Sequence, residues 1–140
     1  MAGSAIPFTL ITPKAIVFEG DAELVIAVTT EGEEGILPKH APFLAALKPG
    51  VLRANVLEDG TVSRLELATS EGFMQALPDR VTVLVDEALR FEDVDVAKTR
   101  EDLASAVAAQ KAGGSDPEVF AREQAVADFA AAKLRLTGQN

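Results

Sequence analysis

The sequence of 140 residues contains no cysteine, tryptophan or tyrosine, and His40 is its single histidine. Without cysteine, disulfides and thiolate chemistry are excluded. The missing tryptophan and tyrosine remove the usual stacking platforms for bases and sugars. Lysine and arginine number 13 against 22 acidic residues, which gives a net charge of -9. A chain this acidic is not expected to carry the basic patches that bind nucleic acid or anionic lipid.

Long apolar runs are also missing, and none approaches the roughly 20 residues that cross a bilayer. The first ten residues, MAGSAIPFTL, have neither a basic n-region nor a long apolar h-region, so we predict no signal peptide. Apolar residues nevertheless make up 48% of the chain. That is enough for the core of one domain with a small appendage. We expect no direct membrane insertion and no nucleic-acid partner.

The pattern of residues 6–90 predicts β-structure. The segments PFTLIT, AIVFEG and AELVIAVT are expected to be separate strands, broken at Pro13 and at Gly20-Asp21. The segments VLRANVLE, SRLELAT and VTVLVD alternate apolar and polar residues, and Asp59-Gly60 between the first two is a hairpin signal. Leu84 on the second face of the last strand predicts that both faces are partly covered. Turn signals roughly every 8 to 12 residues favour an antiparallel sandwich or barrel.

The pattern of residues 92–136 predicts two helices. Asp93 or Asp95 can cap the first, and KAGGS at 111–115 ends it. Asp116-Pro117-Glu118 starts the second with an N-cap acceptor, a proline at N1 and an acid near the positive end of the helix dipole. The predicted apolar stripes are Leu103, Ala104, Val107 and Ala108 in the first helix and Val119, Val126, Phe129 and Ala130 in the second. Because buried alanine contributes little, this hairpin should be less stable than the β domain.

The segment TEGEEGILPKHAPF, residues 30–43, places three glutamates near His40. Such a group can form a metal site, a general acid/base pair or a polar docking loop. Zinc needs three or four His, Cys or acid ligands, and calcium needs a regular ligand spacing that EGEEG lacks. No motif places a serine or threonine nucleophile beside the histidine. We therefore predict no metal and no catalytic residue here, and expect Ile36 and Leu37 to turn into the core. A metal-assisted hydrolase centred on His40 and a free-standing β-sandwich adaptor remain the alternatives.

The same segment resembles the signature of the epsilon subunit of the rotary F-type ATP synthase, which is homologous to the mitochondrial delta subunit. That family carries Glu-Gly-Glu-x-Gly-(Ile/Val)-x-Pro-Gly-His-Ala-Pro followed by Lys-Pro-Gly, and residues 31–42 and 48–50 match it. PFTLITP near the start, FEG at 18–20 and SEGFMQALPDRVTVLVDEA at 70–88 are similar too. The resemblance covers nearly the whole chain. One departure is Lys39, which stands where the family usually has glycine. A lysine would be strained in a left-handed turn, so the resemblance does not determine the backbone conformation at this position.

The resemblance implies an α+β fold, with an antiparallel β-sandwich of about ten strands over residues 1–90 and a two-helix hairpin over residues 91–140. It implies a non-catalytic subunit of the central rotor, at the cytoplasmic face of the bacterial plasma membrane. This subunit would couple proton flow through the c-ring to ATP synthesis by way of the gamma subunit. The hairpin would be regulatory, reaching the catalytic alpha and beta subunits and inhibiting ATP hydrolysis modestly.

By position, the residues implied to dock on the polar loops of the c-ring are Glu31, Glu33, Gly35, Pro38 and His40. Some bacterial members bind regulatory ATP through an (Ile/Leu)-Asp-x-x-Arg-Ala motif. Here Asp95 is kept and Lys98 replaces the arginine, which retains the charge but loses the planar fork of donors. The resemblance thus implies at most a weak nucleotide site at Asp95 and Lys98, and we expect Asp95 to act as an N-cap and ATP not to bind specifically. No other cofactor is implied.

Overall fold

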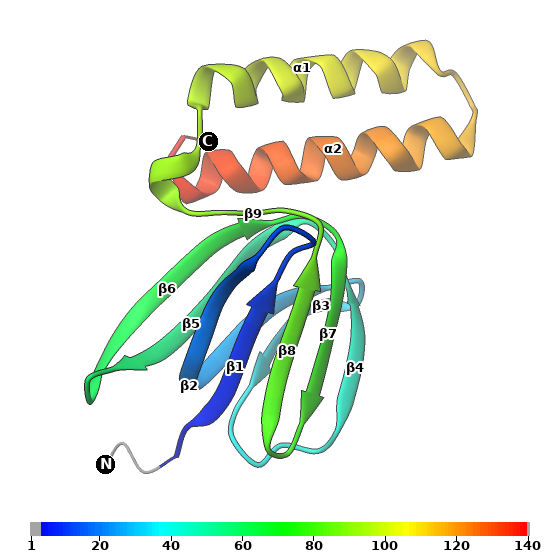
Figure 1. Ribbon diagram of the computed structural model, residues 1–140. Helices are drawn as coiled ribbons and strands as arrows, with labels where there is room; N and C mark the ends of the chain where they lie inside the picture. Colours follow the sequence, from blue (N-terminus) through cyan, green and yellow to red (C-terminus); the bar gives the residue numbers. More distant parts are fainter. Residues whose placement is uncertain (1–3, 140) are drawn as a thin grey trace.

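The computed structural model describes residues 4–139, which form nine strands, one short 3₁₀ helix and two α-helices (Figure 1). The strands are β1 (Ile6–Ile11), β2 (Ile16–Thr29), β3 (Gly32–Ile36), β4 (Phe43–Leu47), β5 (Gly50–Glu58), β6 (Thr61–Thr69), β7 (Gly72–Leu77), β8 (Arg80–Val85) and β9 (Ala88–Leu89). The helices are η1 (Phe91–Asp93), α1 (Val96–Ala112) and α2 (Pro117–Leu136).

The strands hydrogen-bond in the order β1-β8-β7-β4-β2-β5-β6-β9, with β3 beside β2. Because β1 pairs with both β8 and β2, this path folds back on itself into a sandwich (Figure 1). The sandwich confirms the predicted fold class. One detail differs from an all-antiparallel arrangement, since β1 and β8 run parallel.

Strand β2 is continuous, and the prediction that Gly20-Asp21 separates two strands was wrong. Its first half pairs with β1, where Gly20 lies opposite Phe8, and its second half pairs with β5, where Ile26 lies opposite Arg53. The register with β5 shifts between Ala22 and Leu24, and such an irregularity bends a strand without ending it. The long strand therefore passes from one layer of the sandwich to the other.

The core of the sandwich follows the predicted alternation. The turn residues Asp59 and Gly60 both have positive φ, 52° and 77°, which confirms the hairpin between β5 and β6. Leu84, however, is 48% exposed, so the prediction of cover on the second face of β8 was wrong. The predicted inward positions are buried in β5 (Leu52, Ala54, Val56), β6 (Leu65, Leu67) and β8 (Val81, Val83, Val85).

The two helices form a hairpin stacked on one end of the sandwich, with α2 against β5 and β6 and α1 beyond it (Figure 1). The predicted caps are confirmed, because Asp95 accepts a hydrogen bond from the backbone N–H of Lys98 and Asp116 accepts from that of Glu118. The stripe predicted to be the buried face of α1 was wrong. This helix buries Thr99 and Ala106 instead, whereas Val107 is 39% exposed. The buried side chains of α1 are thus small, whereas α2 also buries the larger Phe129 and Leu134.

Among the described residues, no helix combines the length and the apolar character that a membrane crossing requires.

Candidate docking site

The predicted docking residues lie along an edge strand and not on a single loop. Among the strands that the structure describes, β3 pairs only with β2, and residues 31–35 are all exposed. Glu31 lies in the turn from β2 to β3, Glu33 and Gly35 lie on β3 itself, and Pro38 and His40 lie in the loop to β4. Glu33 therefore belongs to a strand and not to a docking loop.

The two flanks of β3 lie at opposite ends of the sandwich. The turn from β2 to β3 is next to the end of β4, since the N–H of Thr30 donates to the carbonyl of Ala46. The loop of residues 37–42 enters β4 at Phe43, opposite Ala76, at the end away from the helices (Figure 1). A strand of this length spans about 16 Å. Glu31 and His40 therefore cannot bind the same small group.

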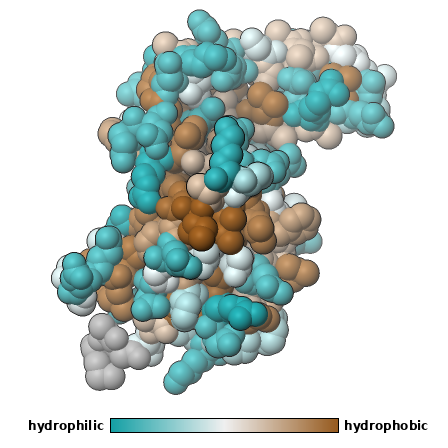
Figure 2. Space-filling view, in the orientation of Figure 1, coloured by the Kyte–Doolittle hydropathy of each residue, from teal (hydrophilic) through white to brown (hydrophobic). Residues whose placement is uncertain are grey.

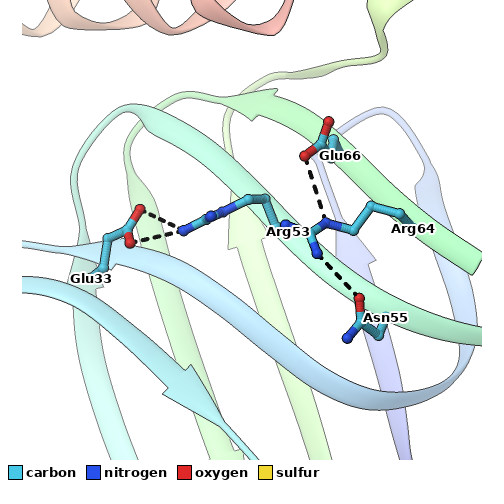
Figure 3. A network of polar contacts seen from close by, with 5 residues as sticks. All are labelled: Glu33, Arg53, Asn55, Arg64 and Glu66. Carbon is cyan, nitrogen blue, oxygen red and sulfur yellow. Dashed lines mark hydrogen bonds and ion pairs between the residues drawn. The ribbon is translucent and has the colours of Figure 1, made fainter.

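Glu33 is engaged in an ion pair on the outer face of the sheet (Figure 3). Both of its carboxylate oxygens accept hydrogen bonds from Nη2 of Arg53, each at 2.8 Å. The pairing is a consequence of sheet register, because β2 lies between the two strands with Val28 opposite Glu33 and Ile26 opposite Arg53. The side chains of Arg53 and Glu33 are 28% and 58% exposed. In such a setting an ion pair contributes about 0 to 1 kcal/mol.

Other polar side chains lie on the same face, beside this pair. Glu66 lies directly opposite Arg53 in the register of β5 and β6. Nε of Arg64 lies 3.6 Å from Glu66, and Nη1 of Arg64 donates to Asn55 at 3.4 Å. Figure 3 shows two groups of contacts, Glu33 with Arg53 and Arg64 with Asn55 and Glu66, with the ribbon of α2 above them. The outer face of β3, β5 and β6 is therefore charged but internally paired.

The loop after β3 has a left-handed backbone conformation at Lys39. Lys39 has a φ of 66°, which is the left-handed conformation that glycine adopts without strain. Ile36 is buried as predicted, but Leu37 is exposed, so the prediction for Leu37 was wrong.

His40 faces its own backbone. Its Nδ1 lies 2.6 Å from the carbonyl oxygen of Ala41, and because a carbonyl only accepts, Nδ1 is the nitrogen that carries the proton. Nε2 is buried and has no hydrogen-bond partner within the described residues. Across residues 4–139, no three His, Asp or Glu side chains are grouped closely enough to hold a metal ion. His40 is thus a loop residue whose second ring nitrogen, Nε2, is buried.

The two residues of the predicted weak nucleotide site are engaged within α1. Asp95 caps the helix through its side-chain oxygen, 3.1 Å from the backbone nitrogen of Lys98. The Lys98 ammonium donates to Asp102 at 2.6 Å, one helical turn on. This hydrogen bond, with the negative charge of Asp102, raises the pKa of Lys98 above its ordinary value. Neither group points to an open phosphate site.

An apolar row, which the sequence pattern does not indicate, lies on the outer face of the other layer. Ile11 lies opposite both Ile16 and Leu84, Leu84 lies opposite Phe73, and Phe73 lies opposite Ala46. Residues directly opposite each other point to the same face of a sheet. The side chains of Ile16 and Phe73 are each 58% exposed. Figure 2 shows hydrophobic side chains gathered on the sandwich just below the helices.

A cleft of about 660 Å³ adjoins this apolar row, and Glu71 and Asp86 lie among its lining residues. In the sequence, Phe73 and Leu84 are single apolar residues at outward positions, and such residues are ordinary on protein surfaces. Only the register of five strands shows that they form a continuous surface with Ile11, Ile16 and Ala46.

The comparisons with known proteins agree on one family. Residues 5–91 match the family model described as the ATP synthase, Delta/Epsilon chain, beta-sandwich domain. The chain is 39% identical over 126 residues to the ATP synthase epsilon chain of Chromobacterium violaceum, covering 90% of this chain and 88% of that one. It is 42% identical over 95 residues to the epsilon chain of Anoxybacillus flavithermus, covering 68% of each.

Two solved structures share the fold. A chain of the Euglena gracilis mitochondrial ATP synthase superposes with a TM-score of 0.75 at 23% identity, covering 94% of this chain and 79% of that chain. A chain of the Tetrahymena thermophila mitochondrial ATP synthase, from a structure of its central stalk and c-ring, gives a TM-score of 0.61 at 19% identity. It covers 94% of this chain and 96% of that chain. At these identities the likeness shows the fold alone.

Proposed function

The chain belongs to the epsilon-chain family of ATP synthase, a non-catalytic subunit of that complex, and we propose that its sandwich joins the c-ring to the gamma subunit in the central rotor. It would lie at the cytoplasmic face of the bacterial plasma membrane and couple proton flow to ATP synthesis. This membership favours the rotor over the alternatives of a free-standing adaptor and a hydrolase centred on His40.

The apolar row is the observation that supports this proposal best. On a chain with a net charge of -9, five side chains in register make a continuous apolar strip across β2, β1, β8, β7 and β4. Apolar patches on otherwise polar surfaces mark interaction sites. We assign this row to the gamma subunit, because a permanent rotor contact needs an apolar centre, and the acids Glu71 and Asp86 beside it can form a polar rim.

The edge strand β3 is assigned to the polar loops of the c-ring. Glu31, Glu33 and Gly35 are exposed along it, and Pro38 limits the loss of loop entropy on binding. A carboxylate on this edge offers an acceptor to backbone amides or basic residues of a ring loop. His40 would contact the c-ring loop through the surface of its imidazole ring and not through Nε2, which is buried.

The test of the apolar row is Phe73→Asp in the reassembled complex. A charge at the centre of an apolar interface is costly unless it is paired, so the variant should lose gamma binding by tenfold or more, about 1.4 kcal/mol. The matched control is Val62→Asp, which also places a charge at an exposed apolar residue but lies on β6 outside the row. Equal gamma affinity for both variants would contradict the assignment.

The broader test is co-purification from detergent-solubilised membranes. We expect the chain to be recovered with gamma and the c-ring, and the isolated protein to show no nucleotide hydrolysis. Turnover by a contaminant-free preparation, or recovery without rotor subunits, would contradict the proposal.

The hairpin is proposed to be a modest regulator that can reach the catalytic alpha and beta subunits. No specific ATP site is proposed at its start, because Asp95 serves as the N-cap and Lys98 binds Asp102. Titration of the isolated protein with ATP, followed by calorimetry, should show no saturable binding in the micromolar range or below; such binding would reinstate the site.

A further inference from the structure

A cleft of about 290 Å³ lies between the end of α2 and the outer face of the sheet. Its lining includes both members of the Glu33–Arg53 pair and Glu66, together with Arg135 from α2. A residue of the proposed ring-docking motif and the last turn of the hairpin thus share one small space.

The same face of the sheet carries the surface on which α2 rests. We call this surface the helix seat and define it as Val51, Ala68 and Leu89, which pack against Phe129, Ala132 and Leu136 of α2. Val51 is two residues from Arg53 on β5, so both side chains point to the same face. In the register of β5 and β6, Ala68 lies opposite Val51 and Glu66 lies opposite Arg53. Arg53 is therefore the immediate neighbour of the helix seat.

The charges in this cleft are balanced by Glu33. Arg53 contributes one cation to the cleft from β5, and Arg135 contributes a second from the helix. Glu66 is shared with Arg64. If Glu33 were engaged elsewhere, Arg53 and Arg135 would line the same cleft with less compensation of their positive charges, and like charges repel.

We propose that Arg53 is a positioning residue that transmits engagement of Glu33 to the hairpin. The inference rests on the proposed function, in which Glu33 contacts a ring loop. Because both oxygens of Glu33 bind Arg53, a donor from the ring must displace or share that arginine. The released cation then loosens the final turn of α2 on the helix seat. Contact with the ring would in this way favour departure of the hairpin.

The experiment is a mutant cycle on the isolated full-length protein, read by amide hydrogen exchange of residues 129–136. Glu33→Gln removes the balancing charge as an engaged ring loop would, and should speed exchange in this segment about two- to fivefold, the range that an exposed ion pair supports. Adding Arg53→Gln should restore the original rate, because the unbalanced cation is gone. Adding Arg53→Lys in place of Arg53→Gln should not restore the rate, because the positive charge remains.

The matched control is Arg80→Gln on the Glu33→Gln background. Arg80 is an exposed arginine at the start of β8 and does not line the cleft, so this change should restore nothing. A purely structural pair would behave differently. Loss of either partner would then speed exchange equally, and the double variant would stay fast.

The outcomes separate this inference from the proposed function. If Glu33→Gln leaves exchange unchanged, or if Arg53→Gln fails to restore it, the role of Arg53 is overturned whatever the complex does. If the cycle behaves as expected, the role of Arg53 is supported. Normal coupling by the reassembled complex with Glu33→Gln would then contradict only the ring contact of Glu33.

Discussion

At the residue scale, Lys39 holds a backbone conformation that suits glycine. Its φ of 66° places the Cβ against the following carbonyl. Asp59 shares this property, with a φ of 52°, but a short polar side chain tolerates the left-handed region better. The loop before β4 therefore keeps its shape at a local cost in free energy.

We predict that Lys39→Gly raises the free energy of unfolding by about 0.5 to 1 kcal/mol, because relief of left-handed strain exceeds the added flexibility of the unfolded chain. Urea unfolding followed by circular dichroism measures the change. Asp59→Gly is the matched control and should gain less. A destabilised Lys39→Gly protein would mean that the lysine side chain makes a stabilising contact that outweighs the strain.

At the element scale, the hairpin is held by a small contact. The residues of α2 buried against the sheet are Phe129 and Ala132. Together with Ala68 of β6 they form the centre of the apolar contact, and two of these three residues are alanines. The Lys133 ammonium lies 4.5 Å from the centre of the Phe129 ring, which adds a cation–π contact. The cations of α2 (Arg122, Lys133, Arg135) equal its acids in number (Glu118, Glu123, Asp128), so attraction to an acidic partner should be weak.

We predict that deleting residues 92–140 raises ATP hydrolysis by the reassembled complex less than tenfold, which corresponds to less than about 1.4 kcal/mol in the barrier. The control is gamma binding by the truncated chain, which must match that of the full chain, because the deletion uncovers the helix seat. A rise of tenfold or more would show that the hairpin is a strong brake and that the charge balance of α2 does not govern its action.

At the scale of the whole molecule, the two proposed docking surfaces lie on different parts of the sandwich. The apolar row crosses β2, β1, β8, β7 and β4, whereas β3 forms an edge beside the other half of β2. Such a division lets one rigid body contact two partners at once. Rigidity comes from the shared core, in which both layers contribute fully buried side chains such as Phe8, Leu10, Leu52 and Leu67.

We predict that Glu33→Ala combined with His40→Ala weakens coupling between proton flow and ATP synthesis while the fold stays intact. The loss of stability should be within roughly 1 kcal/mol, because Glu33 is exposed and His40 lies in a loop. Glu33 lies on β3 and His40 in the loop after it, and within the described residues their side chains share no hydrogen-bond partner, so their effects on stability should add. Proton-driven synthesis by the reassembled complex measures coupling, and Glu58→Ala at a distant hairpin is the control. Normal coupling would refute the docking role, and unfolding would show that the residues are structural.

The sequence by itself determined most of the local structure. Alternation in β5, β6 and β8 identified their buried faces, Asp59-Gly60 fixed a hairpin, and Asp95 and Asp116 fixed the starts of two helices. These features depend on near neighbours in the chain, so the pattern of side chains contains the information. The family signature at residues 31–42 added the identity of the complex, which no composition or spacing could supply.

Only the tertiary structure decided which surfaces are formed from distant segments. The run of β2 through Gly20-Asp21 depends on its two partners, β1 and β5, and the partner of Glu33 depends on β2 lying between β3 and β5. The apolar row joins residues 11, 16, 46, 73 and 84, and the packing of the two helices buries Thr99 and Ala106 of α1 while Val107 stays exposed. Register and close packing are relations between segments far apart in the chain, and a linear pattern of apolar and polar residues does not encode them.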